Sequence, residues 1–271
     1  MYAFFSYYRK KEHKREYEEK VRLFLPRDMD ERKRRRIVRR VFELRGVRKM
    51  QRYLIPLIDD RFIKRFVTAE GLDILNRALA EGRGIILMSA HTGNPHIGFN
   101  ILRALGYEVI ITKGGHPKKQ RKFRYVDTPE YTIFTRSAPL SNTEKERILK
   151  ILESGKIIYY TGDAGGGRKT VEVSFLGRTM NFPTGMLHFA LQTNAIVLPF
   201  FHLYRRGRFK LIFKEPIDGD WKQGEKDYQR IIEEFARLLE SYIFSYPEEY
   251  MGIYGDTALN YYYRSSIKKN G

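Results

Sequence analysis

The stretch Gly84-Ile85-Ile86-Leu87-Met88-Ser89-Ala90-His91-Thr92-Gly93-Asn94-Pro95-His96 decides the fold. Its apolar run, residues 85–88, is typical of a strand that is buried on both faces of a parallel sheet. Asn94 suits the N-cap of a helix, and Pro95 suits the first helical position, where its missing N–H costs nothing. The sequence therefore predicts a strand, a polar turn and a helix in immediate succession.

His91 is consequently expected at the carboxyl end of a strand and beside the start of a helix. In open α/β sheets, ligands and reactive groups gather at this edge. The positive end of the helix dipole favours the neutral imidazole, which is the form that a general base needs. His91 is therefore the first candidate catalytic residue.

The composition limits the chemistry and indicates an anionic partner. The 271 residues are 42% hydrophobic, which is enough for a substantial core in one domain. The chain has no cysteine, and this excludes disulfides, a thiol nucleophile and thiolate metal ligands. A formal charge of +19 predicts binding to a phospholipid surface, an acidic protein, a phosphorylated substrate or nucleic acid.

The positive charge is concentrated near the N-terminus. Residues 1–50 hold 18 Lys or Arg against 8 Asp or Glu, and residues 30–50 carry a helical apolar stripe opposite a basic face. Two interpretations stay open: a solvated helix face, or a surface that docks on anionic lipid. No apolar run approaches the roughly 18 residues that are needed to span a bilayer.

Further strands and helices alternate along the chain, and a strand–helix–strand order gives parallel pairing. We predict an α/β fold with a mixed, largely parallel central sheet flanked by helices, preceded by a basic helical N-terminal region. The expected divisions are residues 1–68 for that membrane-facing region, 69–255 for the α/β domain and 256–271 for a C-terminal tail. Strands are expected near 107–112, 131–135, 156–161, 171–175, 195–203 and 209–213, and helices near 70–80, 97–105, 142–152, 184–193 and 227–244.

Six blocks of the sequence form a recognisable set. The first is residues 82–94, around His91. The later blocks are, in order, Thr161-Gly162-Asp163 with the glycine-rich basic loop after it, Val173–Gly177, Pro183-Thr184-Gly185, Ala195–Pro199 and Pro247–Met251. Together they resemble the lysophospholipid acyltransferase superfamily, in particular its branch of lipid A late acyltransferases (lauroyl and myristoyl transferases). The resemblance covers roughly residues 70–255 and implies the glycerol-phosphate-acyltransferase-like fold.

The resemblance also implies an activity. A fatty acyl chain would pass from a thioester of acyl carrier protein or coenzyme A to a hydroxyl or amine of a lipid or glycolipid, without a covalent enzyme intermediate, a cofactor or a metal. His91 would take the acceptor's proton, and backbone N–H groups of the turn or of the glycine-rich loop would hold the oxyanion. The expected substrate-binding residues are Thr92, Gly93, Asn94, Arg168, Lys169 and Arg178, the last for an anionic head group or the pantetheine phosphate.

One residue departs from the family pattern. The family has an acidic residue five positions after the histidine, and this chain has His96 there. A carboxylate normally fixes the tautomer of the histidine and stabilises the imidazolium that forms. Three interpretations stay open. Asp163, at the end of another strand, supplies the carboxylate; or His96 is a neutral orienting partner or the base itself, with lower activity; or the chain has lost acyl transfer and binds lipid or a partner protein.

The leading hypothesis is a peripheral acyltransferase on the cytoplasmic face of the cell membrane, with an anionic membrane lipid and the acyl donor as its partners. The second is a non-catalytic member of the fold that binds lipid or a protein. Nucleic-acid binding, suggested by the charge and by Tyr261, Tyr262 and Tyr263 near Arg264, is disfavoured because no recognisable motif accompanies them. The sequence leaves the acceptor, the acyl length, the carrier and the oligomeric state open.

Overall fold

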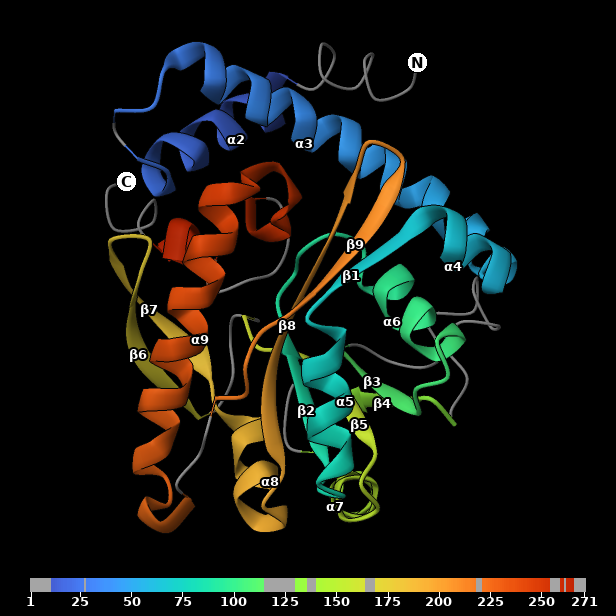
Figure 1. The fold of residues 1–271 in the computed structure, drawn as a ribbon. Helices are drawn as coiled ribbons and strands as arrows, with labels where there is room; N and C mark the ends of the chain where they lie inside the picture. The colour runs from blue at the N-terminus through green and yellow to red at the C-terminus, as the bar shows by residue number, and fades with distance from the viewer. Residues whose placement is uncertain are drawn as a thin grey trace.

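A seven-stranded sheet with the order β1-β9-β8-β2-β5-β3-β4 forms the centre of the molecule (Figure 1). The computed structural model describes residues 11–26, 28–114, 130–135, 140–163, 169–217, 221–253, 259–260 and 262–265. The strands are β1 (Val67–Glu70), β2 (Ile85–Ser89), β3 (Val109–Gly114), β4 (Thr132–Thr135), β5 (Ile157–Thr161), β8 (Ile196–Arg205) and β9 (Arg208–Phe213). All neighbours pair in parallel except β8 and β9, which confirms the predicted mixed, largely parallel sheet.

Helices cover both faces of this sheet (Figure 1). The side chains of Ile85 and Leu87 belong to one core with α5 (Leu72–Ala80) and α6 (Pro95–Ala104). Those of Ile86 and Met88 belong to the other core, with α7 (Asn142–Glu153), α8 (Gly185–Thr193) and α9 (Lys226–Ser245). Successive side chains of a strand point to opposite faces, so a strand between two helical layers needs an unbroken apolar sequence.

The N-terminal region is helical and crosses the end of the sheet at which β2 finishes (Figure 1). Its described residues form α2 (Lys11–Phe24), α3 (Glu31–Gln51), the 3-10 helix η1 (Arg52–Leu57) and α4 (Asp60–Phe66). Val38 and Val41 of the apolar stripe are buried, while Arg35 and Arg36 on the other side of α3 are exposed. Among the described residues, no helix is both long and apolar enough to cross a bilayer.

Two strands were not expected from the sequence. β1 pairs with β9 at the sheet edge, across the residue at which the N-terminal region was expected to end. β7 (Arg178–Pro183) forms an antiparallel hairpin with β6 (Thr170–Phe175), outside the main sheet. The chain after α9 continues through short 3-10 helices, η5 (Pro247–Glu249) and η6 (Met251–Ile253), while η4 (Trp221–Gln223) precedes α9.

Candidate active site

His91 and Asp163 meet at the carboxyl ends of two adjacent parallel strands. In the register of β2 and β5, Ser89 lies opposite Thr161, so each of the two residues follows its strand at the same distance. The His91 ring Nδ1 lies 2.7 Å from Asp163 Oδ1, and the backbone N–H of His91 donates to the same oxygen at 3.0 Å. The approach of Asp163 to His91 is thereby confirmed, while the catalytic roles of both residues stay predictions.

The carboxylate of Asp163 is completely buried, whereas the His91 side chain is 25% exposed. The second oxygen of the carboxylate, Oδ2, has no hydrogen-bond partner within the described part of the chain. Burying an incompletely paired carboxylate is costly. Such a group is typical of a functional site, and here the carboxylate contacts the imidazole of His91.

Hydrogen bonds from the C-terminal segment fix the turn that carries His91. The carbonyl of His91 accepts from the N–H of Met251 at 2.6 Å, the N–H of Gly93 donates to the carbonyl of Glu249 at 3.1 Å, and Thr92 forms a β-bridge with Tyr250. The N–H of Thr92 donates to the carbonyl of Ala90. The N–H groups of residues 91–93 therefore all donate to partners within the protein. The oxyanion role stays a prediction, and its other candidate, the glycine-rich loop after Asp163, lies outside the described residues.

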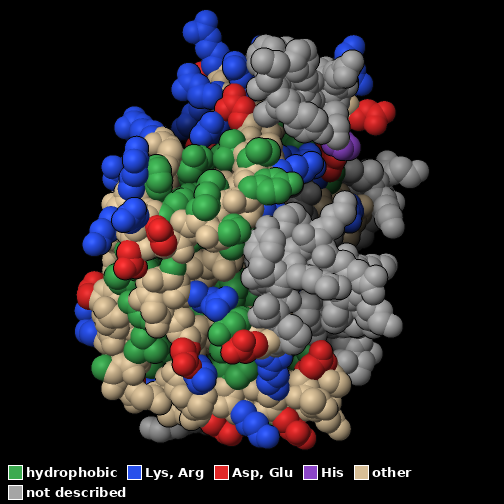
Figure 2. Space-filling view, turned by 90° about the vertical axis from the view of Figure 1, so that its right-hand side faces the viewer, with side chains coloured by type: hydrophobic (Ala, Val, Ile, Leu, Met, Phe, Trp, Pro, Cys, Tyr) green, Lys and Arg blue, Asp and Glu red, His purple; other side chains and the backbone are tan. Residues whose placement is uncertain are grey.

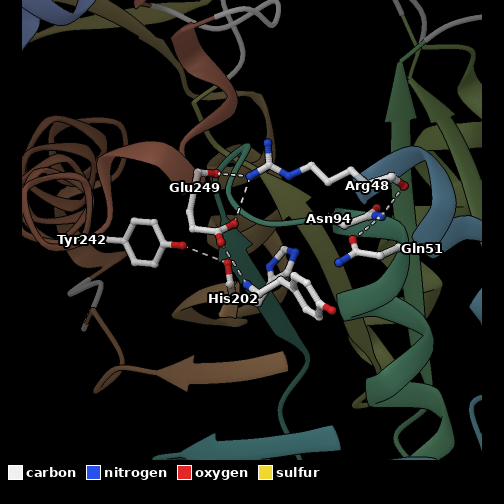
Figure 3. Close-up of polar contacts among 7 residues, drawn as sticks. Arg48, Gln51, Asn94, His202, Tyr242 and Glu249 are labelled. Atoms are coloured by element: carbon white, nitrogen blue, oxygen red, sulfur yellow. Dashed lines mark hydrogen bonds and ion pairs between the residues drawn. The ribbon is translucent and has the colours of Figure 1, made fainter. Parts of the chain in front are cut away.

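Asn94 occupies the N-cap position of α6, but its side chain does not cap the helix. Its Nδ2 donates instead to the carbonyl of Arg48 and to Oε1 of Gln51, both at 3.1 Å (Figure 3). Gly93 has a φ of +50°, and a Cβ there would lie 2.6 Å from the carbonyl oxygen of His202. Thr92, Gly93 and Asn94 are all buried. Through their hydrogen bonds and the β-bridge they connect the end of β2 to α3 and to the C-terminal segment.

A buried ion pair connects the N-terminal and C-terminal parts of the site (Figure 3). Arg48 Nη2 donates to Oε2 of Glu249 at 3.0 Å and to the Glu249 carbonyl at 2.8 Å, and the N–H of Tyr204 donates to Oε1 at 3.3 Å. Burial raises the pKa of Glu249, and Arg48 opposes that rise. The sequence analysis missed this pair: the block Pro247–Met251 pointed to Glu249, but nothing distinguished Arg48 among the many arginines of α3.

Beside His91 lies an open pocket of about 340 Å³. His96, in the first turn of α6, lines this pocket. Burial, together with the charges of Lys113 and Arg52, lowers the pKa of His96 to about 3. The imidazole of His96 is therefore neutral near pH 7 and a poor proton acceptor, which argues against His96 as the general base. The lining residues are Arg45, Arg48, Lys49, Arg52, His91, Asn94, Pro95, His96, Ile111, Thr112, Lys113, Tyr159, Thr161 and Met251.

The remaining sequence candidates lie elsewhere. Lys169 is exposed and pairs with Glu225 at 2.9 Å. Arg178 is the first residue of β7, at the turn of the β6–β7 hairpin. Within the described residues neither lines the pocket beside His91. Arg168 and the glycines before it lie outside the described residues.

Comparison with known proteins identifies the family. A sequence model of the bacterial lipid A biosynthesis acyltransferases matches residues 2–254. The chain belongs to this family. Membership confirms the resemblance seen in the sequence and extends it over the N-terminal helices. The match therefore includes α3 together with the His91 turn that α3 contacts.

Two curated relatives carry the name phosphatidylinositol mannoside acyltransferase. Both are from Mycobacterium tuberculosis, strains ATCC 25618 / H37Rv and CDC 1551 / Oshkosh, and each is 30% identical to this chain over 162 residues. The aligned part is 58% of this chain and 50% of each relative. The chain thus spans about half the length of the curated relatives that it matches.

Proposed function

We propose that the chain transfers a fatty acyl group from an acyl thioester to a hydroxyl or amine of a lipid or glycolipid, with His91 as general base. The contact between His91 Nδ1 and Asp163 Oδ1 at 2.7 Å is the observation that carries this proposal. An ionised carboxylate only accepts hydrogen bonds, so it holds the proton on Nδ1 and leaves Nε2 to take a proton from the acceptor.

The reaction proceeds by addition and elimination. The acceptor oxygen or nitrogen forms a bond to the thioester carbonyl carbon while its proton passes to His91 Nε2. Asp163 stabilises the imidazolium that results. The carbon–sulfur bond then breaks, and the proton on His91 returns to the thiolate of coenzyme A or acyl carrier protein. No group of the protein becomes acylated.

Asp163 also bears on the alternative function, a non-catalytic member of the fold. That alternative rests on His96, which stands where the family has an acid. Because Asp163 gives His91 a carboxylate from β5, the replacement at position 96 removes no charge that this geometry needs. The geometry therefore favours the catalytic proposal.

The acceptor and the location are part of the same proposal. The names of the relatives point to a lipid with a phosphate-containing head group as the class of acceptor. We propose the cytoplasmic face of the cell membrane as the location, where a soluble donor such as acyl-coenzyme A or acyl carrier protein meets the lipid acceptor. The exposed apolar side chains of Met50, Tyr53 and Leu57, next to the basic face of α3, are the proposed contact with that membrane.

The test is thiol release from acyl-coenzyme A and from acyl carrier protein, with and without a membrane lipid extract. We expect release that needs lipid and that falls to background in His91→Ala. A labelled acyl chain then identifies the acceptor. No release with any donor, from a folded protein that still binds anionic vesicles, would establish the non-catalytic alternative.

A further inference from the structure

The imidazole of His202 is buried against the turn that carries His91. His202 belongs to β8 and is 2% exposed. A Cβ at Gly93, two residues after His91, would lie 2.7 Å from the ring carbon Cδ2 of His202 and 3.0 Å from Nε2. A Cβ at Gly98 would lie 3.1 Å from the same ring carbon. The ring therefore occupies a slot that is open because both neighbours are glycines.

The two glycines are otherwise unfavourable for the local structure. Gly98 lies inside α6, where glycine costs about 1 kcal/mol relative to alanine. At Gly93 the φ of +50° favours glycine, and the carbonyl oxygen of His202 would lie 2.6 Å from an added Cβ. The close approach of His202 gives both positions a packing reason for glycine.

His202 is also held on its other sides. Its ring stacks on Phe200, with the ring centroids 5.7 Å apart and the planes at 13°. The hydroxyl of Tyr242, in α9, donates to the His202 carbonyl at 2.9 Å (Figure 3). The ring is thus fixed by β8 and α9, and the turn rests on a rigid support.

The shape of the His202 ring matters more than its hydrogen bonding. Neither ring nitrogen makes a well-formed hydrogen bond with the described residues, and the backbone of Asn94 is the polar group that favours its protonated form. Burial outweighs that effect and lowers the pKa of His202 to about 4, so the ring is neutral near pH 7. A neutral ring between two glycines acts as a spacer.

We propose that His202 is a positioning residue for acyl transfer: its ring sets the distance between β8 and the His91 turn, and thereby keeps the His91 imidazole against Asp163. This inference rests on the proposed function. The connection is short, because Gly93 contacts the ring and the N–H of His91 donates to the Asp163 carboxylate. A displacement of about 1 Å in such a site can cost about 100-fold in rate.

Gly98→Ala tests the spacer without removing a buried side chain. The new methyl group meets the His202 ring and shifts it, whereas alanine itself favours the helix, so the free energy of unfolding should change by less than about 2 kcal/mol. We expect kcat to fall about tenfold or more, with the KM of the acyl donor unchanged within about twofold. Gly185→Ala is the matched control, because a Cβ at this exposed glycine meets nothing within 4 Å.

A second change should restore what the first disturbs. His202→Asn shortens the side chain and makes room for the methyl group of Gly98→Ala. The double variant should therefore have a higher kcat than the product of the two single effects predicts. Independent effects of the two substitutions on kcat would overturn the spacer, since contact between the ring and position 98 is its basis.

The protonation pattern of His91 supplies a measurement that does not need acyl transfer. Long-range ¹H–¹⁵N NMR spectra show which ring nitrogen carries the proton, and His91→Ala assigns the signals. The wild type and Gly185→Ala should show the Nδ1–H form that Asp163 favours, and Gly98→Ala should lose it in part. An unchanged His91 pattern in Gly98→Ala would overturn the positioning role even if thiol release is observed. A changed pattern supports that role even if no donor reacts.

Discussion

His91 and Asp163 are 72 residues apart in the sequence and are brought together by strand topology. Their pairing could be predicted, because each follows an apolar run that the sequence marks as a strand, and adjacent parallel strands end at the same edge. His96 was harder to interpret. Its position in the family motif suggested a partner for His91, whereas its neighbours in space, Lys113 and Arg52, belong to other elements.

Replacement of Asp163 tests the residue pair directly. Asp163→Asn keeps the shape of the side chain but lets its amide donate to His91 Nδ1, which favours the wrong tautomer. In the serine-protease triad, the corresponding change lowers kcat by about 10⁴, and we expect a loss of at least 10³ here. The measurement is acyl transfer at saturating donor, with a check of folding by circular dichroism. A folded variant with more than about a tenth of the wild-type rate would contradict the role given to Asp163.

His202 predicts how stability depends on pH. Burial lowers its pKa to about 4, from an ordinary value near 6.5. Between pH 6.5 and pH 4 the imidazole is protonated in the unfolded chain but not in the folded chain. The free energy of unfolding is therefore unaffected by this residue above pH 6.5 and decreases as the pH drops toward 4. The loss from this residue is about 2 kcal/mol at pH 5. Urea unfolding from pH 7.5 to 5 should show a shallower pH slope in His202→Gln, and parallel slopes for the two proteins would contradict the assignment.

At the scale of elements, the turn after β2 is held between α3 on one side and the segment of η5 and η6 on the other. Arg48 and Glu249 connect these two supports, although 201 residues separate them in the sequence. Sequence spacing carries no signal for such a contact. The block around His91 and the C-terminal block Pro247–Met251, which lie far apart in the sequence, are therefore in direct contact in the fold.

A double-mutant cycle measures this connection. Removing one partner of a buried ion pair leaves an uncompensated charge, so Arg48→Met should lower the free energy of unfolding by about 3 to 5 kcal/mol. Arg48→Met combined with Glu249→Gln should cost clearly less than the sum of the two single changes. The deficit of Arg48→Met should shrink at acidic pH, because the pKa of Glu249 is already raised by burial and protonation removes the unpaired charge. Additive single effects would show that the pair is not coupled.

The helices and strands that were predicted well from the sequence are those marked by a pattern of their own residues, such as an apolar run or a capping box. Apolar runs gave β2, β5 and β8, and Ser141 with Glu144 forms the capping box at the start of α7. β1 was missed because it is a short strand at the sheet edge whose last three residues are exposed, so it has no apolar pattern. Its existence depends on pairing with β9, which is a tertiary contact.

At the scale of the whole molecule, α3 carries two groups of basic side chains that could not be told apart from the sequence. Its exposed arginines form an outer face, while Arg48 and Lys49 near its end line the pocket. Hydrophobic side chains gather on the adjoining face, with Lys and Arg above and beside them (Figure 2). Met50, Tyr53 and Leu57 are 66%, 65% and 61% exposed in the α3–η1 segment. Docking by this segment would place the pocket mouth at the lipid surface.

Vesicle binding tests that orientation. Tyr53→Asp with Leu57→Asp removes two apolar contacts and adds negative charge, so we expect affinity for anionic phosphatidylglycerol vesicles to fall about 100-fold or more. Phe244→Asp is the control, because Phe244 is 50% exposed but belongs to α9. Wild-type binding should also weaken with salt, since the basic face of α3 contributes a screened electrostatic attraction. If the double variant cosediments as well as Phe244→Asp does, the α3–η1 segment is not the membrane contact, and the pocket must receive its lipid from another side.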